Sequence, residues 1–194
     1  MNSARLGVSI PSEFSQVRLV GAALRGVLTD LGCGEEQLVT IELCAVEAIN
    51  NVIEHAYKEQ AGHQVRVQLA VRERRLELTV SDDGAAMPDG ALDRVRAALR
   101  ARDSGEEEAL VLGQVAEGGY GLGLILQTMD EVSYQREAGH NTLQMSLRLE
   151  PDATAGASGV ASGVASGADL AAGADLGDPA AATNTEDPPE RRGR

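Results

Sequence analysis

The chain has 194 residues, with 17 basic and 30 acidic side chains and a formal net charge of −13 at pH 7. That length is enough for one folded domain with a sizeable core, and not comfortably enough for two. The acidic balance argues against a nucleic-acid-binding surface, which is normally basic, so no direct contact with nucleic acid is expected.

Nothing in the sequence indicates a membrane or exported protein. No apolar run approaches the length that spans a bilayer, and residues 1–10 lack a signal-peptide pattern. The two cysteines, Cys33 and Cys44, do not have metal-ligand spacing. The simplest interpretation is a cytoplasmic protein without a structural disulfide.

The first part of the chain predicts a strand and two helices. The strand is expected at Leu6–Ile10, and the first helix at Ser12–Leu31, with Ser12 as its N-cap and Gly32 as its stop. The second helix is expected over Glu35–Tyr57, where apolar residues recur with helical spacing.

A polar stripe accompanies the apolar side of this second helix. Glu47, Asn51 and His55 follow one another at four-residue intervals. A carboxylate can accept a proton or orient a nucleophile, and an amide oxygen is a hard ligand suited to Mg²⁺. A solvated face of an amphipathic helix explains the same stripe. For His55, a role in capping or packing the helix end is expected.

A predicted hairpin follows and ends in an acidic turn. Its strands are expected at Gln64–Val71 and Arg75–Ser81, and the second runs directly into Asp82, Asp83 and Gly84. An acidic residue at a strand end, followed by a glycine, can receive the exocyclic amine of a ligand. Taken alone, an ordinary Asp-Gly turn explains this pattern better.

The next helix is expected at Asp89–Arg102 and is rich in arginine. Any one of Arg94, Arg96, Arg100 and Arg102 could reach a ligand phosphate, although a solvated helix face is the simpler interpretation. Beyond an acidic segment that includes residues 106–108, glycines crowd residues 118–123 and lead into a helix expected at Gly121–Met129.

These glycines would let backbone N–H groups approach phosphate oxygens at a helix N-terminus. No GK[ST] follows them, which excludes a Walker loop, and no strand leads into them, which argues against a dinucleotide fingerprint.

Closing strands are expected at Glu131–Arg136 and Thr142–Leu149. Residues 151–194, rich in Ala, Gly, Ser and Asp with near-repeats, predict a disordered tail after a domain at 1–150.

Three segments in this order resemble the boxes of the GHKL ATPase superfamily. They are EAINNVIEHAY, VSDDGAAMP and EGGYGLGLILQTMDEVSY. Within that superfamily the chain most resembles the anti-sigma factor serine kinases, over about residues 6–150. The resemblance implies an α+β fold of the Bergerat, or histidine kinase-like ATPase, type. This fold is a two-layer α/β sandwich with a mixed, mainly antiparallel sheet and helices on one face.

The resemblance also implies roles for individual residues in binding ATP and Mg²⁺. Asn51 would be the Mg²⁺ ligand, Glu47 the general base, and Asp82 the acceptor for the adenine amino group. The remaining expected nucleotide contacts are Gly84, Met87, Gly119, Gly121, Leu122 and Gly123. Ala86 stands where the family usually has a second glycine, which would stiffen the adenine pocket.

The implied function is that of an ATP-dependent protein serine kinase acting as an anti-sigma factor. Its partners would be a sigma factor and a STAS-type anti-sigma factor antagonist, which it would phosphorylate on serine. A homodimer through the first helix and strand is also expected from the resemblance. Two alternatives remain open: a nucleotide-binding partner-switch module without efficient phosphoryl transfer, and a kinase with a different target.

Overall fold

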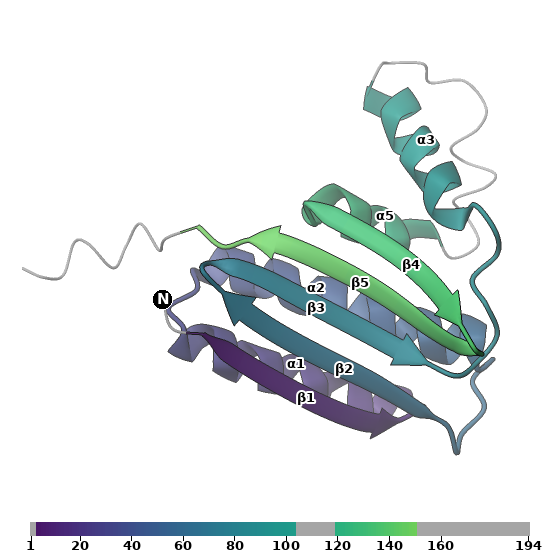
Figure 1. Ribbon diagram of the computed structural model, residues 1–194, viewed down its shortest axis with the longest axis horizontal. Coiled ribbons are helices and arrows are strands. Elements are labelled where there is room, and N and C mark those ends of the chain that lie inside the picture. The colour runs from purple at the N-terminus through teal and green to yellow at the C-terminus, as the bar shows by residue number, and fades with distance from the viewer. Residues whose placement is uncertain (1–2, 104–118, 151–194) are drawn as a thin grey trace, which may run out of the picture. The chain divides into compact units, whose positions relative to one another are not determined.

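The computed structural model describes residues 3–103 and 119–150. Its sheet has five strands in the order β1-β2-β3-β5-β4 (Figure 1). The strands are β1 (Ala4–Pro11), β2 (Gln64–Arg72), β3 (Arg75–Asp82), β4 (Glu131–Glu137) and β5 (His140–Arg148). Every pairing among these strands is antiparallel. The expected α+β sandwich is confirmed, with a described sheet that is wholly antiparallel rather than mixed.

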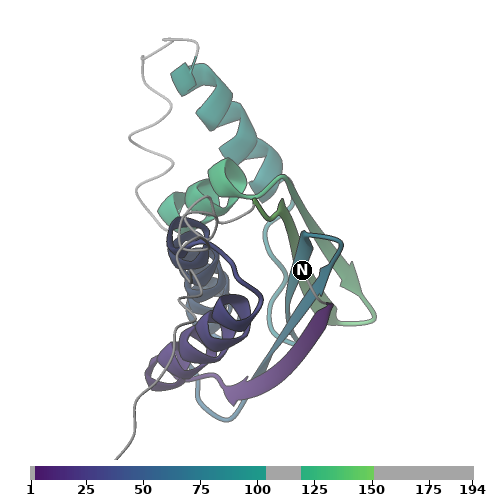
Figure 2. The same ribbon diagram turned by 90° about the vertical axis from the view of Figure 1, so that its left-hand side faces the viewer.

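The described helices are α1 (Phe14–Asp30), α2 (Glu35–Asn51), the π-helix η1 (Val52–Ala56), α3 (Ala91–Asp103) and α5 (Gly119–Thr128). Helices α1, α2 and α5 form the second layer of the sandwich, and α3 packs against α5 (Figure 1). Figure 2 shows α1 and α2 side by side on one face of the sheet, as expected from the resemblance. Residues 104–118 and 151–194, which contain the acidic segment and the expected tail, lie outside the described residues. No helix in the described part of the chain is long and apolar enough to cross a membrane.

The core lies between the two layers because each layer presents one apolar face. Alternate residues of β2 and β3 point toward the helices and are buried. They are Val65, Val67, Leu69, Val71, Leu76, Leu78 and Val80. Opposite them, α2 buries Leu38, Ile41, Cys44, Ala45, Ala48 and Ile49 at helical spacing. This packing fixes the orientation of α2 and therefore holds its polar residues Glu47 and Asn51 beside the core.

The two ends of α1 differ in how well they were predicted. Gly32 has a φ of +71°, and the N–H groups of Gly32 and Cys33 donate to the carbonyls of Thr29 and Leu28 at 2.9 and 3.0 Å. This is the expected glycine stop, in a Schellman arrangement. The prediction of Ser12 as N-cap is wrong, because Glu13 occupies that position without a side-chain cap.

Instead of capping α1, Ser12 makes hydrogen bonds to a distant loop. Its hydroxyl donates to the Gln60 carbonyl at 2.7 Å and accepts from the His63 N–H at 3.3 Å. The side chain is buried. Ser12 therefore ties the start of α1 to the loop that leads into β2.

The expected long helix over Glu35–Tyr57 changes its winding at Val52. There α2 gives way to η1, and the Tyr57 N–H bonds to the Val52 carbonyl at 3.0 Å, five residues back. π-helical turns often mark functional sites. The Tyr57 hydroxyl donates to Gln64 O at 2.8 Å and accepts from Asp83 N at 3.0 Å. The end of η1 is thus attached to the loop that follows β3.

A close backbone contact completes this attachment. The Ala85 N–H donates to the Ala56 carbonyl at 2.9 Å. A Cβ placed on Gly84 would lie 2.7 Å from that same carbonyl oxygen and 2.9 Å from the Ala56 Cβ. Because both obstacles belong to the end of η1, Gly84 has to be a glycine for the loop to reach the helix.

We predict that Gly84→Ala lowers the free energy of unfolding by about 1–3 kcal/mol, the usual cost of overpacking. Gly26→Ala is the matched control, because Gly26 lies inside α1 with nothing within 4 Å of an added Cβ. That control should raise stability by up to ~1 kcal/mol through helix propensity. Urea unfolding of both variants tests the prediction, and an equal gain in both would contradict the close contact.

Candidate nucleotide-binding site

A cavity of about 830 Å³ opens between α2 and η1, the end of β3, the loop after it, and α3. Ligand sites in proteins commonly have volumes of about 300–1,000 Å³ and mostly apolar linings with few polar groups. The polar residues lining this cavity are Asn51, His55, Lys58, Asp82, Arg94, Tyr134 and Asn141. Its apolar lining includes Val52, Val80, Met87, Val95, Leu122 and Leu143.

Asp82 is a buried carboxylate in this cavity, with 4% of its surface exposed. Its Oδ1 accepts from the Gly84 N–H at 2.8 Å and from Asn141 Nδ2 at 2.7 Å. Burial raises the pKa of Asp82, and the hydrogen bond from Asn141 counteracts this. No described residue donates to Oδ2, which leaves an acceptor for an N–H group of a ligand.

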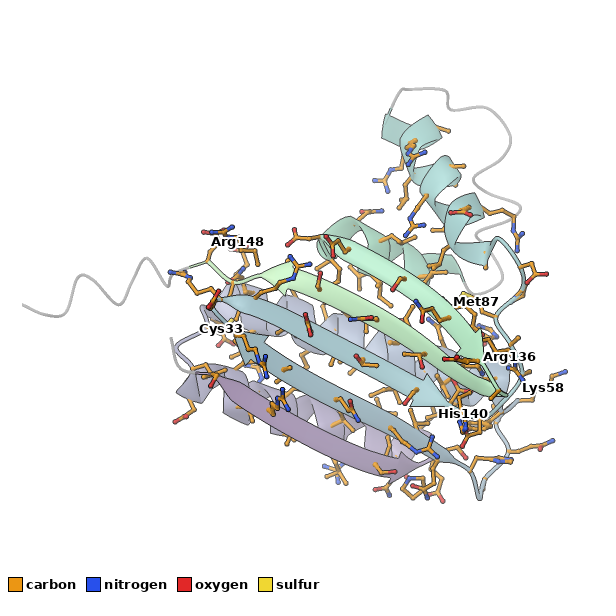
Figure 3. All side chains as sticks on the ribbon, in the orientation of Figure 1. Cys33, Lys58, Met87, Arg136, His140 and Arg148 are labelled. Atoms are coloured by element: carbon orange, nitrogen blue, oxygen red, sulfur yellow. The ribbon has the colours of Figure 1, made fainter. Side chains whose placement is uncertain are left out.

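The neighbouring Asp83 faces away from the cavity. Its Oδ2 pairs with Arg66 Nη2 at 2.9 Å, and its Oδ1 contacts His140. The hydrogen bond from Arg66 lowers the pKa of Asp83. The two adjacent aspartates thus differ in surroundings, and Asp82 is the one in a position to meet a ligand. Figure 3 shows His140 and Arg136 at the same end of the sheet as Met87.

Two residues of the predicted polar stripe line the cavity. Asn51 does so with its side chain partly buried, and no described residue is hydrogen-bonded to its amide. His55 is exposed at the cavity rather than packed as expected. Glu47, one turn before Asn51, is partly buried and is not a lining residue.

Glu47 instead lies against α5. A Cβ on Gly121 would overlap the Glu47 Oε2 and would lie 3.1 Å from its Cδ. The absence of a side chain at Gly121 therefore leaves room for the Glu47 carboxylate. This contact joins two of the segments that carried the family resemblance.

The expected glycine loop is helical in the structure. Helix α5 begins at Gly119, two residues before the predicted start at Gly121. Among the residues of α5 from position 121 onward, Leu122 is the one that lines the cavity, while an added Cβ on Gly123 would lie 3.9 Å from Val95 of α3. Gly84 is likewise not a lining residue, whereas Met87 is. Direct nucleotide contacts by these glycines remain a prediction.

Of the four arginines in α3, Arg94 is the one that lines the cavity. Its Nη1 donates to the Asp89 carbonyl at 2.7 Å. Arg96 is held elsewhere, by Asp93 at 3.1 Å and by the Val132 carbonyl at 2.6 Å. The sequence did not distinguish between these arginines. Lys58 is the other long cationic side chain at the cavity.

A metal ion at this cavity would need ligands from a substrate as well as from the protein. The described residues hold no group of three His, Cys, Asp or Glu side chains that could bind a metal unaided. Mg²⁺ commonly takes one or two protein oxygens and completes its shell with phosphates and water. The Asn51 amide oxygen at the cavity, with the Glu47 carboxylate one turn away, fits that kind of site.

Sequence reasoning missed Asn141 and Tyr134. Asn141 is 2% exposed, and its neighbours Leu143 and Met145 at alternate positions of β5 are buried too. A polar residue in phase with core residues was the available signal, but the expected strand began only at Thr142. The hydroxyl of Tyr134 accepts from the Met87 N–H at 2.9 Å and donates to Asn141 Oδ1 at 2.7 Å.

Residues 10–147 match the family model described as the histidine kinase-like ATPase domain. Among curated relatives, the serine-protein kinase RsbW of Bacillus subtilis is 29% identical over 139 residues, covering 71% of this chain and 82% of the relative. Its namesake from Bacillus pumilus is 33% identical over 135 residues, covering 68% and 78%.

Two crystal structures have a similar fold. The RsbU and RsbW domains of a Mycobacterium tuberculosis protein align with a TM-score of 0.52 at 18% identity, covering 77% of this chain and 34% of that one. The SiaB-SiaC complex from Pseudomonas aeruginosa aligns with a TM-score of 0.53 at 18% identity, covering 73% and 88%. With this fold, these boxes and these relatives, the chain belongs to the histidine kinase-like ATPase family and is RsbW-like within it.

Proposed function

We propose that this chain is an ATP-dependent protein serine kinase that acts as an anti-sigma factor. The observation that carries the proposal is the cavity that both Asp82 and Asn51 line, with Glu47 one turn from Asn51. Its relatives named serine-protein kinase support the same activity. The folded domain at 1–150 would carry the site, and the cytoplasm would supply its ATP.

Asp82 would recognise the base of ATP. Its Oδ2 lacks a described partner and can accept a hydrogen bond from the adenine amino group, while the apolar side chain of Met87 at the cavity can pack on the ring. Gly84 acts indirectly, by letting the loop that holds both residues reach η1. The base would thus be held by one polar contact within apolar walls.

Asn51 and Glu47 would act at the phosphate end. Asn51 would offer its amide oxygen to Mg²⁺, which, when bound, neutralises charge on the phosphates during transfer. Glu47 would accept the proton of the attacking serine hydroxyl. The room at Gly121 accommodates the Glu47 carboxylate beside α5, which supports this role. Backbone N–H groups around Gly119, Gly121, Leu122 and Gly123 would face the phosphates.

The proposed partners are a sigma factor, which the protein would bind, and a STAS-type anti-sigma factor antagonist, which it would phosphorylate on serine. We also propose a homodimer through α1 and β1. Incubation of the protein with γ-³²P-ATP, Mg²⁺ and small STAS-type proteins from the same genome tests the enzymatic part. Label on a serine of one such protein is the expected result. ATP binding without label on any of them would instead favour a sequestering module.

We predict that Glu47→Ala slows single-turnover phosphoryl transfer by roughly 10²–10⁴-fold, as expected for loss of a general base, and leaves ATP affinity near that of the wild type. Glu54→Ala is the matched control, because Glu54 is exposed in η1 and does not line the cavity. Rapid-quench measurement at saturating ATP provides the rate. An unchanged rate in the Glu47 variant would remove this residue from the chemistry.

Asn51→Ala should abolish the gain in ATP affinity that Mg²⁺ provides, because the amide oxygen is the proposed protein ligand. Titration calorimetry with ATP, in Mg²⁺ and in EDTA, measures this gain. The neighbouring Asn50→Ala is the control, since Asn50 is partly buried on the same helix but is not a lining residue. A normal Mg²⁺ effect in the Asn51 variant would contradict the metal assignment.

Asp82→Asn should weaken ATP binding by roughly 10–100-fold, the usual value of a hydrogen bond to a charged group. GTP binding should change much less, so the preference for ATP should narrow. Asp83→Asn serves as the control, because Asp83 pairs with Arg66 outside the cavity. Competition of both nucleotides with a fluorescent ATP analogue checks this, and an unaltered preference in the Asp82 variant counts against adenine recognition there.

A further inference from the structure

The hairpin formed by β4 and β5 is hydrogen-bonded to the loop that follows β3. Arg136 Nη1 donates to the Gly84 carbonyl at 3.0 Å, and Asn141 Nδ2 donates to the Ala85 carbonyl at 3.1 Å. The Met87 N–H donates to the Tyr134 hydroxyl at 2.9 Å. Three side chains of one hairpin thereby hold the loop beside the cavity at Gly84, Ala85 and Met87.

Asn141 is the centre of this network. Its Oδ1 accepts from Arg136 Nη1 at 2.6 Å and from the Tyr134 hydroxyl at 2.7 Å. Its Nδ2 donates to Asp82 Oδ1 at 2.7 Å. The residue is 2% exposed, so these protein groups are the main hydrogen-bond partners of its amide.

The orientation of this amide follows from the chemistry of its neighbours. A guanidinium can only donate hydrogen bonds, so Arg136 requires the oxygen of Asn141 on its side. Rotating the amide by half a turn would place a donor against Arg136 and an oxygen against the Asp82 carboxylate. Both new contacts would be repulsive, so Arg136 and Asp82 together fix the direction in which Asn141 donates.

This orientation determines what Asp82 can offer a ligand. Oδ1 is engaged by Asn141 and the Gly84 N–H, which leaves Oδ2 as an acceptor without a described donor. A 6-amino purine supplies the missing N–H group, whereas a 6-oxo purine presents another acceptor there. Sites built around a buried hydrogen bond reject ligands that cannot complete it.

We propose that Arg136 and Asn141 are positioning residues that make the Asp82 cavity selective for 6-amino over 6-oxo purine nucleotides. The inference rests on the proposed function, because it presumes that the cavity binds the base of ATP. It assigns a part to Arg136, whose side chain is exposed and is not among the lining residues. Selectivity would therefore depend on a residue outside the cavity wall.

The test is titration calorimetry of the full chain with ATP and with GTP in Mg²⁺, comparing wild type with Arg136→Met. The substitution keeps the apolar stem and removes the donors, and an exposed side chain should be replaceable without loss of the core. We expect the ratio of GTP to ATP dissociation constants to fall about tenfold or more. Arg136→Lys, which keeps one cationic donor, should recover part of the ratio.

Arg75→Met is the matched control. Arg75 is an exposed arginine of the same sheet that pairs with Glu131 at 2.6 Å and does not line the cavity. Asn141→Ala should lower the ratio at least as far as Arg136→Met, with Ser146→Ala as a control for the loss of a buried polar group from β5. Thermal unfolding of each variant separates altered selectivity from altered folding.

The possible outcomes separate a failure of this inference from a failure of the proposed kinase function. A wild type that prefers ATP, together with an Arg136→Met variant that has lost the preference, supports the positioning role. A preference retained in Arg136→Met, or an equal loss of both nucleotides, overturns that role and leaves the proposed kinase intact. A wild type that binds no ATP overturns both.

Discussion

Burial of the Asp82 carboxylate is the constraint on which the rest of the site depends. A buried charge is costly unless hydrogen bonds compensate it, and two donors at Oδ1 provide that compensation. One comes from the loop after β3, at Gly84, and the other from β5, at Asn141. The loop can adopt this position only because Gly84 fits against Ala56. The carboxylate therefore ties the sheet, the hairpin and the end of η1 together.

The helix layer sets the other end of the cavity. Burial of one face of α2 against β2 and β3 fixes how its polar stripe is turned, so that Asn51 lines the cavity and Glu47 meets α5. At Val52 the helix changes to a π-helical turn, which brings Tyr57 against the loop after β3. One continuous segment thus both contacts the loop proposed to hold the base and carries the residues proposed for catalysis.

The sequence predicted the features that depend on neighbouring residues, such as strand alternation and the end of α1. Alternation in β2 and β3 and the glycine stop at Gly32 were confirmed. The Ser12 cap, the π-helical turn and Asn141 were missed, because each depends on contacts between distant segments. Asp82 and Asn141 are register partners across β3 and β5, although 59 positions separate them along the chain. The sequence marks Asn141 as a polar residue among buried neighbours, but only the pairing of the two strands shows that it lies opposite Asp82.

The most direct test of the account is a crystal structure of the protein with a non-hydrolysable ATP analogue and Mn²⁺, whose anomalous signal locates the metal. The account predicts the adenine amino group within hydrogen-bond distance of Asp82 Oδ2 and the metal bound to the Asn51 amide oxygen. A base bound away from Asp82, or a metal that does not contact Asn51, would contradict it.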